Sequence, residues 1–90
     1  MPLYAIICKD RADALQTRLD NRQAHLDYIA ETGIVVMAGP LMQSGEMRGS
    51  LVIVEATELA SAKAWSAGDP YLAAGLFDTV EVIEWKKVIG

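Results

Sequence analysis

The chain has 90 residues, of which 52% are hydrophobic and 22% are charged, and its formal net charge at pH 7 is −4. This length predicts one domain over residues 1–90, and the apolar composition excludes intrinsic disorder. The negative net charge argues against a nucleic-acid partner, and the single cysteine, Cys8, excludes a disulfide framework. No apolar run is long enough for a membrane span. We therefore expect a soluble protein of the cytoplasm.

The first half of the chain predicts a strand, a long helix and a second strand. Residues 3–8 form a short apolar run that is typical of a strand. Asp10 is suited to cap a helix over residues 11–32, which Gly33 would end. The apolar stripe of this helix consists of Leu15, Leu19, Leu26 and Ile29. The second strand is predicted over residues 34–38, and we expect Gly39 and Pro40 to end it.

The second half predicts two further strands with helical segments between them. The polar residues 43–46 turn the chain into a strand over 51–55, which favours an antiparallel hairpin. Thr57 is suited to cap a helix over residues 58–67, which Gly68 would end. Asp69 and Pro70 are typical of the N-cap and first position of a short helical turn ending near residue 75. The β-rich residues 79–85 predict the last strand.

The order of elements, β-α-β-β-α-β, predicts an α+β fold of the ferredoxin-like type. Such a fold has an antiparallel four-stranded sheet with both helices on one face. The third strand is nevertheless apolar on both faces, because Leu51 and Ile53 point one way while Val52 and Val54 point the other. An uncovered apolar sheet is not expected on a soluble monomer. We therefore predict a homodimer in which a second copy covers this face.

Three polar side chains lie close to the apolar stripe of the first helix. On a helical wheel Arg22 lies near the centre of the stripe, and Arg18 and His25 lie at its edge. A buried arginine needs an anionic partner, either a protein carboxylate or a ligand. His25 is the only histidine, and imidazole is the side chain that normally exchanges protons near neutral pH. N-capping alone explains Asp69, although one carboxylate oxygen can cap while the other orients an imidazole.

Other site types find no support in the sequence. No glycine-rich motif joins a strand to a helix, so no nucleotide site is predicted. One histidine and scattered carboxylates do not make a metal site, and we expect neither a metal nor a cofactor. Cys8 lies in an apolar strand and is predicted to be a core residue.

Several short motifs, taken in order, resemble those of the YCII-related (YciI-like) family. They are Arg22-Gln23-Ala24-His25-Leu26, Ala38-Gly39-Pro40-Leu41, Gly49-Ser50-Leu51, and Asp69-Pro70-Tyr71 with Ala74-Gly75-Leu76-Phe77. The resemblance extends from the first strand to Trp85. It implies a dimeric α+β barrel, in which the sheets of two ferredoxin-like subunits face each other. It also implies that His25 and Asp69 meet in a pocket as a catalytic pair.

Three functions are compatible with these residues. The first is a cofactor-independent lyase or isomerase that transfers a proton on a small anionic or phenolic molecule, because related barrels include muconolactone isomerases and a family member is a dehydrochlorinase. His25 would be the acid or base, Asp69 would hold its tautomer, and Arg22 and Arg18 would bind substrate charge. The second is a non-catalytic module that binds or senses a small molecule in the same pocket. The third is a structural dimerisation domain, in which His25 and Arg22 only satisfy internal partners.

Overall fold

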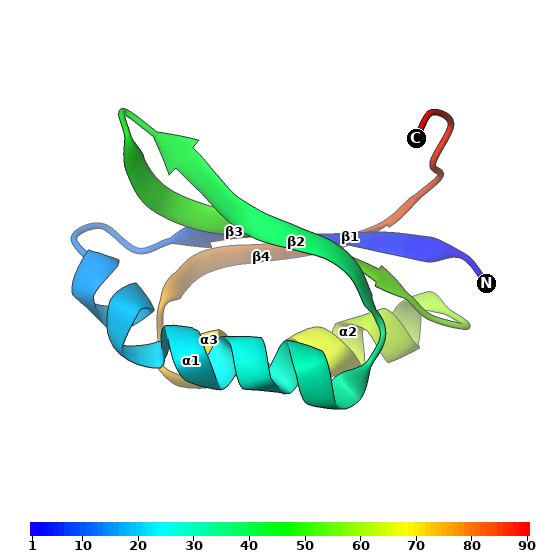
Figure 1. Ribbon diagram of the computed structural model, residues 1–90, viewed down its shortest axis with the longest axis horizontal. Coiled ribbons are helices and arrows are strands. Elements are labelled where there is room, and N and C mark those ends of the chain that lie inside the picture. Colours follow the sequence, from blue (N-terminus) through cyan, green and yellow to red (C-terminus); the bar gives the residue numbers. More distant parts are fainter.

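The computed structural model describes residues 1–90 as a curved antiparallel sheet with helices packed against one face (Figure 1). The elements are β1 (Leu3–Asp10), α1 (Leu15–Thr32), β2 (Val35–Gln43), β3 (Glu46–Glu55), α2 (Leu59–Ala67), α3 (Pro70–Ala73) and β4 (Phe77–Trp85). The strand order is β2-β3-β1-β4, and every pair of neighbours is antiparallel. The predicted ferredoxin-like α+β fold is confirmed. None of the helices has the length and hydropathy needed to cross a bilayer.

The core lies between the sheet and the helices. Alternate residues of a strand point to opposite faces, so one set of β1 and β3 side chains meets the helices. The core cluster consists of Tyr4, Ile6, Cys8, Val52, Val54, Ala56, Ala62 and Trp65. From α1, by contrast, the buried residues are polar, namely Arg18 and His25. The predicted burial of Cys8 is confirmed, since only 1% of it is exposed.

Helix α1 differs from its prediction in both its start and its inward face. It begins at Leu15, and Asp10 does not cap it, because Asp10 continues β1 and binds Arg18. The leucines of the predicted stripe remain partly exposed; Leu19, for example, is 47% exposed. The helix is instead rotated so that Arg18 and His25 face the sheet, where other elements supply their polar partners. A helical wheel ranks residues by hydrophobicity alone, so it cannot predict that a polar side chain is buried against polar partners from other elements.

The β2–β3 hairpin is longer than predicted. Strand β2 continues through Gly39 and Pro40 because it lies at the edge of the sheet, where proline need not break a ladder hydrogen bond. The turn shrinks to Ser44 and Gly45, whose φ angles are 52° and 78°, as a tight two-residue hairpin turn requires. Thr57 does not cap α2; Glu58 occupies that position without a side-chain hydrogen bond.

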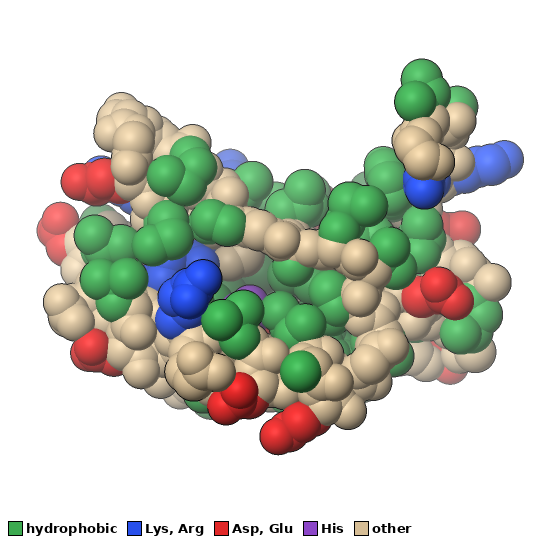
Figure 2. Space-filling model, viewed as in Figure 1, with side chains coloured by type: hydrophobic (Ala, Val, Ile, Leu, Met, Phe, Trp, Pro, Cys, Tyr) green, Lys and Arg blue, Asp and Glu red, His purple; other side chains and the backbone are tan.

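The sheet face turned away from the helices is apolar and open. By register this face carries Met37, Leu51 and Ile83, which are 50%, 37% and 51% exposed. Figure 2 shows hydrophobic side chains along the upper side of the molecule, above a hollow between the β2–β3 hairpin and α1. The expectation of two apolar faces is therefore confirmed, whereas the homodimer that would cover the open face stays a prediction.

Candidate functional site

A cavity of about 170 Å³ opens between α1, the β2–β3 hairpin and α3. One part of its wall is polar and the other is apolar, an arrangement suited to a small molecule with one polar edge. The polar residues are Arg18, Arg22, His25, Ser50 and Tyr71, and the apolar ones are Leu26, Ile29, Ala38, Pro40, Met47 and Val52. Figure 2 shows the purple histidine deep inside the hollow and a blue side chain at its rim.

His25 and Asp69 form a buried pair in this region. His25 Nδ1 lies 2.8 Å from Asp69 Oδ1, and the two residues are 6% and 3% exposed. The expectation that they lie within hydrogen-bonding distance is confirmed. Because an ionised carboxylate only accepts, it holds the proton of a neutral ring on Nδ1 and leaves Nε2 with a free lone pair. The neutral ring thereby has the tautomer of a base that acts through Nε2.

The position of Asp69 follows from the local sequence. Its carboxylate caps α3 by accepting from the Tyr71 backbone N–H over 2.9 Å, and Pro70 occupies the first helical position. The structure corrects one expectation, since Oδ1 makes both the cap and the contact with His25. Just before Asp69, a Cβ at Gly68 would approach the Tyr28 hydroxyl to 2.5 Å, so a larger residue there would displace the Tyr28 side chain. The cap and the proline after Asp69 are therefore the local features that position its carboxylate.

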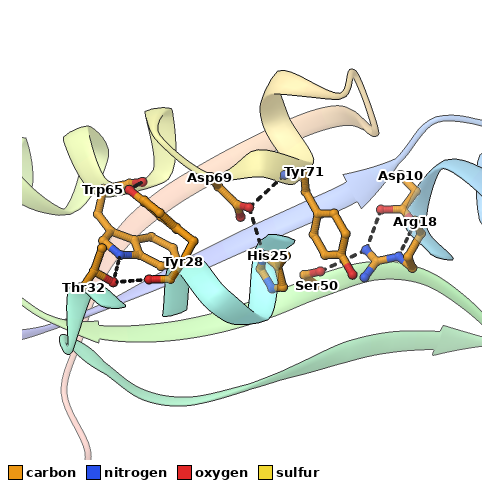
Figure 3. A network of polar contacts seen from close by, with 9 residues as sticks. All are labelled: Asp10, Arg18, His25, Tyr28, Thr32, Ser50, Trp65, Asp69 and Tyr71. Atoms are coloured by element: carbon orange, nitrogen blue, oxygen red, sulfur yellow. Dashed lines mark hydrogen bonds and ion pairs between the residues drawn. The ribbon is translucent and has the colours of Figure 1, made fainter. Parts of the chain in front are cut away.

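A second set of hydrogen bonds fixes the C-terminal half of α1. Tyr28 donates to the Trp65 carbonyl over 2.7 Å, and Trp65 Nε1 donates to Thr32 Oγ1 over 2.8 Å (Figure 3). These bonds join α1 to α2 on the side away from the polar cavity wall. Since His25 lies one turn before Tyr28, they also restrain the helix that carries the imidazole.

Tyr71 is a site residue whose role the sequence reasoning missed. Its ring stacks on His25 with centroids 4.0 Å apart and an interplanar angle of 17°. On its other side the Arg18 guanidinium lies 4.8 Å from the ring centroid, so Tyr71 stands between the two groups (Figure 3). Burial raises the pKa of the Tyr71 phenol, against the opposing charges of Arg18 and Arg22. The sequence signal for this role is the Asp69–Pro70 helix start, because it places Tyr71 in the first turn of α3, next to α1.

The two candidate arginines occupy different environments. Arg18 donates to Asp10 through Nε and Nη2, both over 2.8 Å, and each side chain is 3% exposed. Its Nη2 also donates to Ser50 Oγ over 2.9 Å. The anionic partner that a buried arginine needs is thus a protein carboxylate here. Arg22 is exposed at the cavity and has no carboxylate partner, so its charge is available to a ligand.

Nucleophilic and metal chemistry find little support in the side chains present. Burial, and to a smaller extent the charge of Asp69, raises the pKa of the Cys8 thiol to about 12, so the thiol is neutral at physiological pH. No three His, Cys, Asp or Glu side chains cluster at distances suited to a metal ion. The cavity groups that could take part in a reaction or bind a substrate are therefore an imidazole, an unpaired guanidinium and two hydroxyls.

Known proteins share this sequence pattern and fold. The YCII-related domain family matches residues 2–86. The protein YciI of Escherichia coli O6:H1 is 40% identical, with 96% of this chain and 98% of that protein aligned. A 5-chloro-2-hydroxyhydroquinone dehydrochlorinase from Burkholderia phenoliruptrix, solved with 2,5-dihydroxybenzoquinone, has 35% identity and a TM-score of 0.86 over 93% of both chains. A dimeric protein of unknown function from Bacteroides fragilis shares the ferredoxin-like fold, with 15% identity, a TM-score of 0.53 and 94% of each chain covered.

Proposed function

The chain belongs to the YCII-related domain family, and from this premise we propose that it is an enzyme that transfers a proton on a small anionic or phenolic molecule. Family and fold relatives support the broader class, a small-molecule enzyme or binding module. The observation that carries the narrower proposal is the buried His25–Asp69 pair, 2.8 Å apart, beside a cavity that His25 lines.

In the proposed mechanism, His25 acts as the general base. Its Nε2 takes a proton from the substrate, and the electron pair of the broken bond remains on the substrate. The Asp69 carboxylate stabilises the imidazolium that forms, while Arg22 holds the negative charge of the substrate. In an isomerisation the proton returns at another atom, and in an elimination the electron pair expels a leaving group as an anion. General acid–base catalysis of this kind contributes about 10²- to 10⁴-fold in rate.

The dehydrochlorinase relative favours elimination and supplies a first substrate to test. Elimination of HCl needs one base for the proton and an exit for chloride, and no oxidant or reductant. The direct experiment measures chloride release from 5-chloro-2-hydroxyhydroquinone by the wild-type chain and by His25→Asn. We expect release by the wild type and a loss of at least about 100-fold in the variant. A rate equal in both would contradict the role of His25.

The two alternative functions predict different results when chloride release and thermal stabilisation are both measured. A binding or sensing module would be thermally stabilised by 2,5-dihydroxybenzoquinone without any chloride release. A structural dimerisation domain would show neither stabilisation nor turnover. The structural alternative requires an internal carboxylate partner for Arg22. Arg22 lines the cavity together with His25 and has no such partner, which favours a ligand site.

We also propose that the chain acts as one domain within a homodimer. The open apolar face with Met37, Leu51 and Ile83 is suited to the same face of a second copy, which gives the facing sheets of a dimeric α+β barrel. A cytoplasmic location is part of this proposal, because Cys8 is a free thiol.

A further inference from the structure

Two hydroxyl groups of the cavity wall, those of Ser50 and Tyr71, lie against the buried Arg18 guanidinium. Arg18 Nη2 donates to Ser50 Oγ over 2.9 Å, and the guanidinium carbon lies 4.8 Å from the Tyr71 ring centroid. The hydroxyl end of Tyr71 is directed toward the same group (Figure 3). Ser50 is 3% exposed and Tyr71 is 2% exposed, and both line the cavity. The two hydroxyls therefore occupy one corner of the site.

Each hydroxyl retains a proton to donate. A hydroxyl accepts and donates at once, and Ser50 Oγ already accepts from Arg18. No protein acceptor receives the Ser50 proton, and the cavity is the open space beside it. Burial keeps the pKa of the Tyr71 phenol above its ordinary value, so this group is also protonated at neutral pH. Both residues can thus donate into the cavity.

The Arg18–Asp10 pair makes these donors stronger without adding net charge. A group that accepts from a cation is polarised and donates more strongly in turn. Asp10 balances the charge of Arg18 through two hydrogen bonds of 2.8 Å. The corner is therefore built for a single oxygen that becomes negative during a reaction. A multiply charged group such as phosphate would find only one unpaired cation at this cavity, Arg22.

We propose that Ser50 Oγ–H and Tyr71 Oη–H form a donor pair that binds the substrate oxygen on which negative charge develops as His25 removes a proton. The inference rests on the proton transfer proposed above and narrows its substrates to compounds with an acidic C–H beside a conjugated carbonyl, including the keto tautomer of a phenol. The broken C–H bond leaves its electron pair on the conjugated system and its oxygen, and the proton forms a bond to His25 Nε2. Preorganised donors at such an oxygen commonly contribute about 10²- to 10³-fold in rate.

The test measures the affinity of 2,5-dihydroxybenzoquinone, followed by its visible absorbance, for the wild type, Ser50→Ala and Tyr71→Phe. The Tyr71→Phe change keeps the ring against His25 and removes only the hydroxyl. Each variant should bind about 10- to 100-fold more weakly, the range for losing a hydrogen bond to a charged acceptor. Matched controls are Ser66→Ala and Tyr4→Phe, which alter buried residues outside this cavity and should bind within about twofold of wild type.

The outcomes separate this inference from the proposed function when His25→Asn is measured alongside. Wild-type affinity in both Ser50→Ala and Tyr71→Phe would overturn the donor pair, as would equal weakening in the two controls. If His25→Asn alone loses affinity, the histidine site stands and the donor pair is wrong. If the wild type does not bind the quinone at all, both the donor pair and the proposed ligand class are wrong.

Discussion

Asp69 holds the His25 ring with the same oxygen that caps helix α3. Oδ1 lies 2.8 Å from His25 Nδ1 and 2.9 Å from the Tyr71 backbone nitrogen. One atom thus fixes the imidazole and begins the helix that carries the ring stacked on it. A disturbance at this oxygen affects the orientation of His25 and Tyr71 together.

The double role of Asp69 predicts that two substitutions there differ in stability. In Asp69→Asn the amide oxygen can still accept both hydrogen bonds, so the free energy of unfolding should change by less than about 1 kcal/mol. Asp69→Ala loses the cap and leaves a buried imidazole N–H without a partner, which together cost about 2–4 kcal/mol. Urea unfolding at fixed protein concentration measures both. Equal losses in the two variants would show that the charge, not the acceptor atom, stabilises the fold.

Arg18 and Arg22 should separate stability from ligand binding. Arg18→Met leaves Asp10 as an unpaired buried charge and should cost about 3–5 kcal/mol, whereas adding Asp10→Leu should recover much of this loss. Arg22→Met changes an exposed side chain and should alter stability by less than about 0.5 kcal/mol while weakening an anionic ligand. Urea unfolding and quinone titration measure the two effects. Strong destabilisation by Arg22→Met would contradict the assignment of a free guanidinium.

The features that the sequence predicts correctly are those set by neighbouring residues. Strand alternation places Val52 and Val54 in the core, and the Asp69–Pro70 dipeptide begins α3 as its local geometry requires. The contact of His25 with Asp69 spans 44 positions, and only the family resemblance implied it. No local pattern connects residues so far apart in the chain.

The features that the sequence misses are those decided by tertiary partners. Asp10 is a residue type that often caps a helix, but here its carboxylate accepts two hydrogen bonds from Arg18. Such a charged pair is stronger than a cap, and β1 continues through Asp10. The same hydrogen bonds direct the Arg18 side of α1 toward the sheet, and the leucine stripe remains partly exposed. The sequence predicts that Pro40 ends the strand, because proline cannot donate a ladder hydrogen bond. At the edge of the sheet that donor is not needed, so β2 continues through Pro40. Tyr71 became a site residue through stacking that composition does not encode.

The buried thiol of Cys8 predicts a specific dependence of stability on pH. Its pKa rises from about 9 in the unfolded chain to about 12 in the folded one, because burial disfavours the thiolate. The unfolded chain therefore loses this proton first, so the contribution is complete below about pH 9 and is lost as the pH rises toward 12. Between about pH 8 and pH 10.5, the wild type should lose more unfolding free energy than Cys8→Ala. Parallel losses in urea unfolding would contradict this.

The open sheet face predicts that a charge there disturbs assembly. Ile83→Asp places a carboxylate on the β4 side of the apolar surface, where burial against a second copy would be costly. Light scattering at micromolar concentration should give the mass of two chains for the wild type and of one chain for Ile83→Asp. The control Gln43→Asp, at the exposed hairpin, should remain a dimer. A stable, folded wild-type monomer would remove the basis of the prediction.

The central claim, that Asp69 prepares His25 for proton transfer through Nε2, is tested most directly by ¹⁵N NMR of the single histidine at a pH at which its ring is neutral. The carboxylate only accepts, so over the 2.8 Å contact it keeps the ring proton on Nδ1. We predict that this proton lies on Nδ1 in the wild type and in Asp27→Asn, a change on the exposed side of α1, and that the preference is lost in Asp69→Ala. A proton on Nε2 in the wild type, or an unchanged tautomer in Asp69→Ala, would reduce Asp69 to a helix cap and leave His25 without its partner.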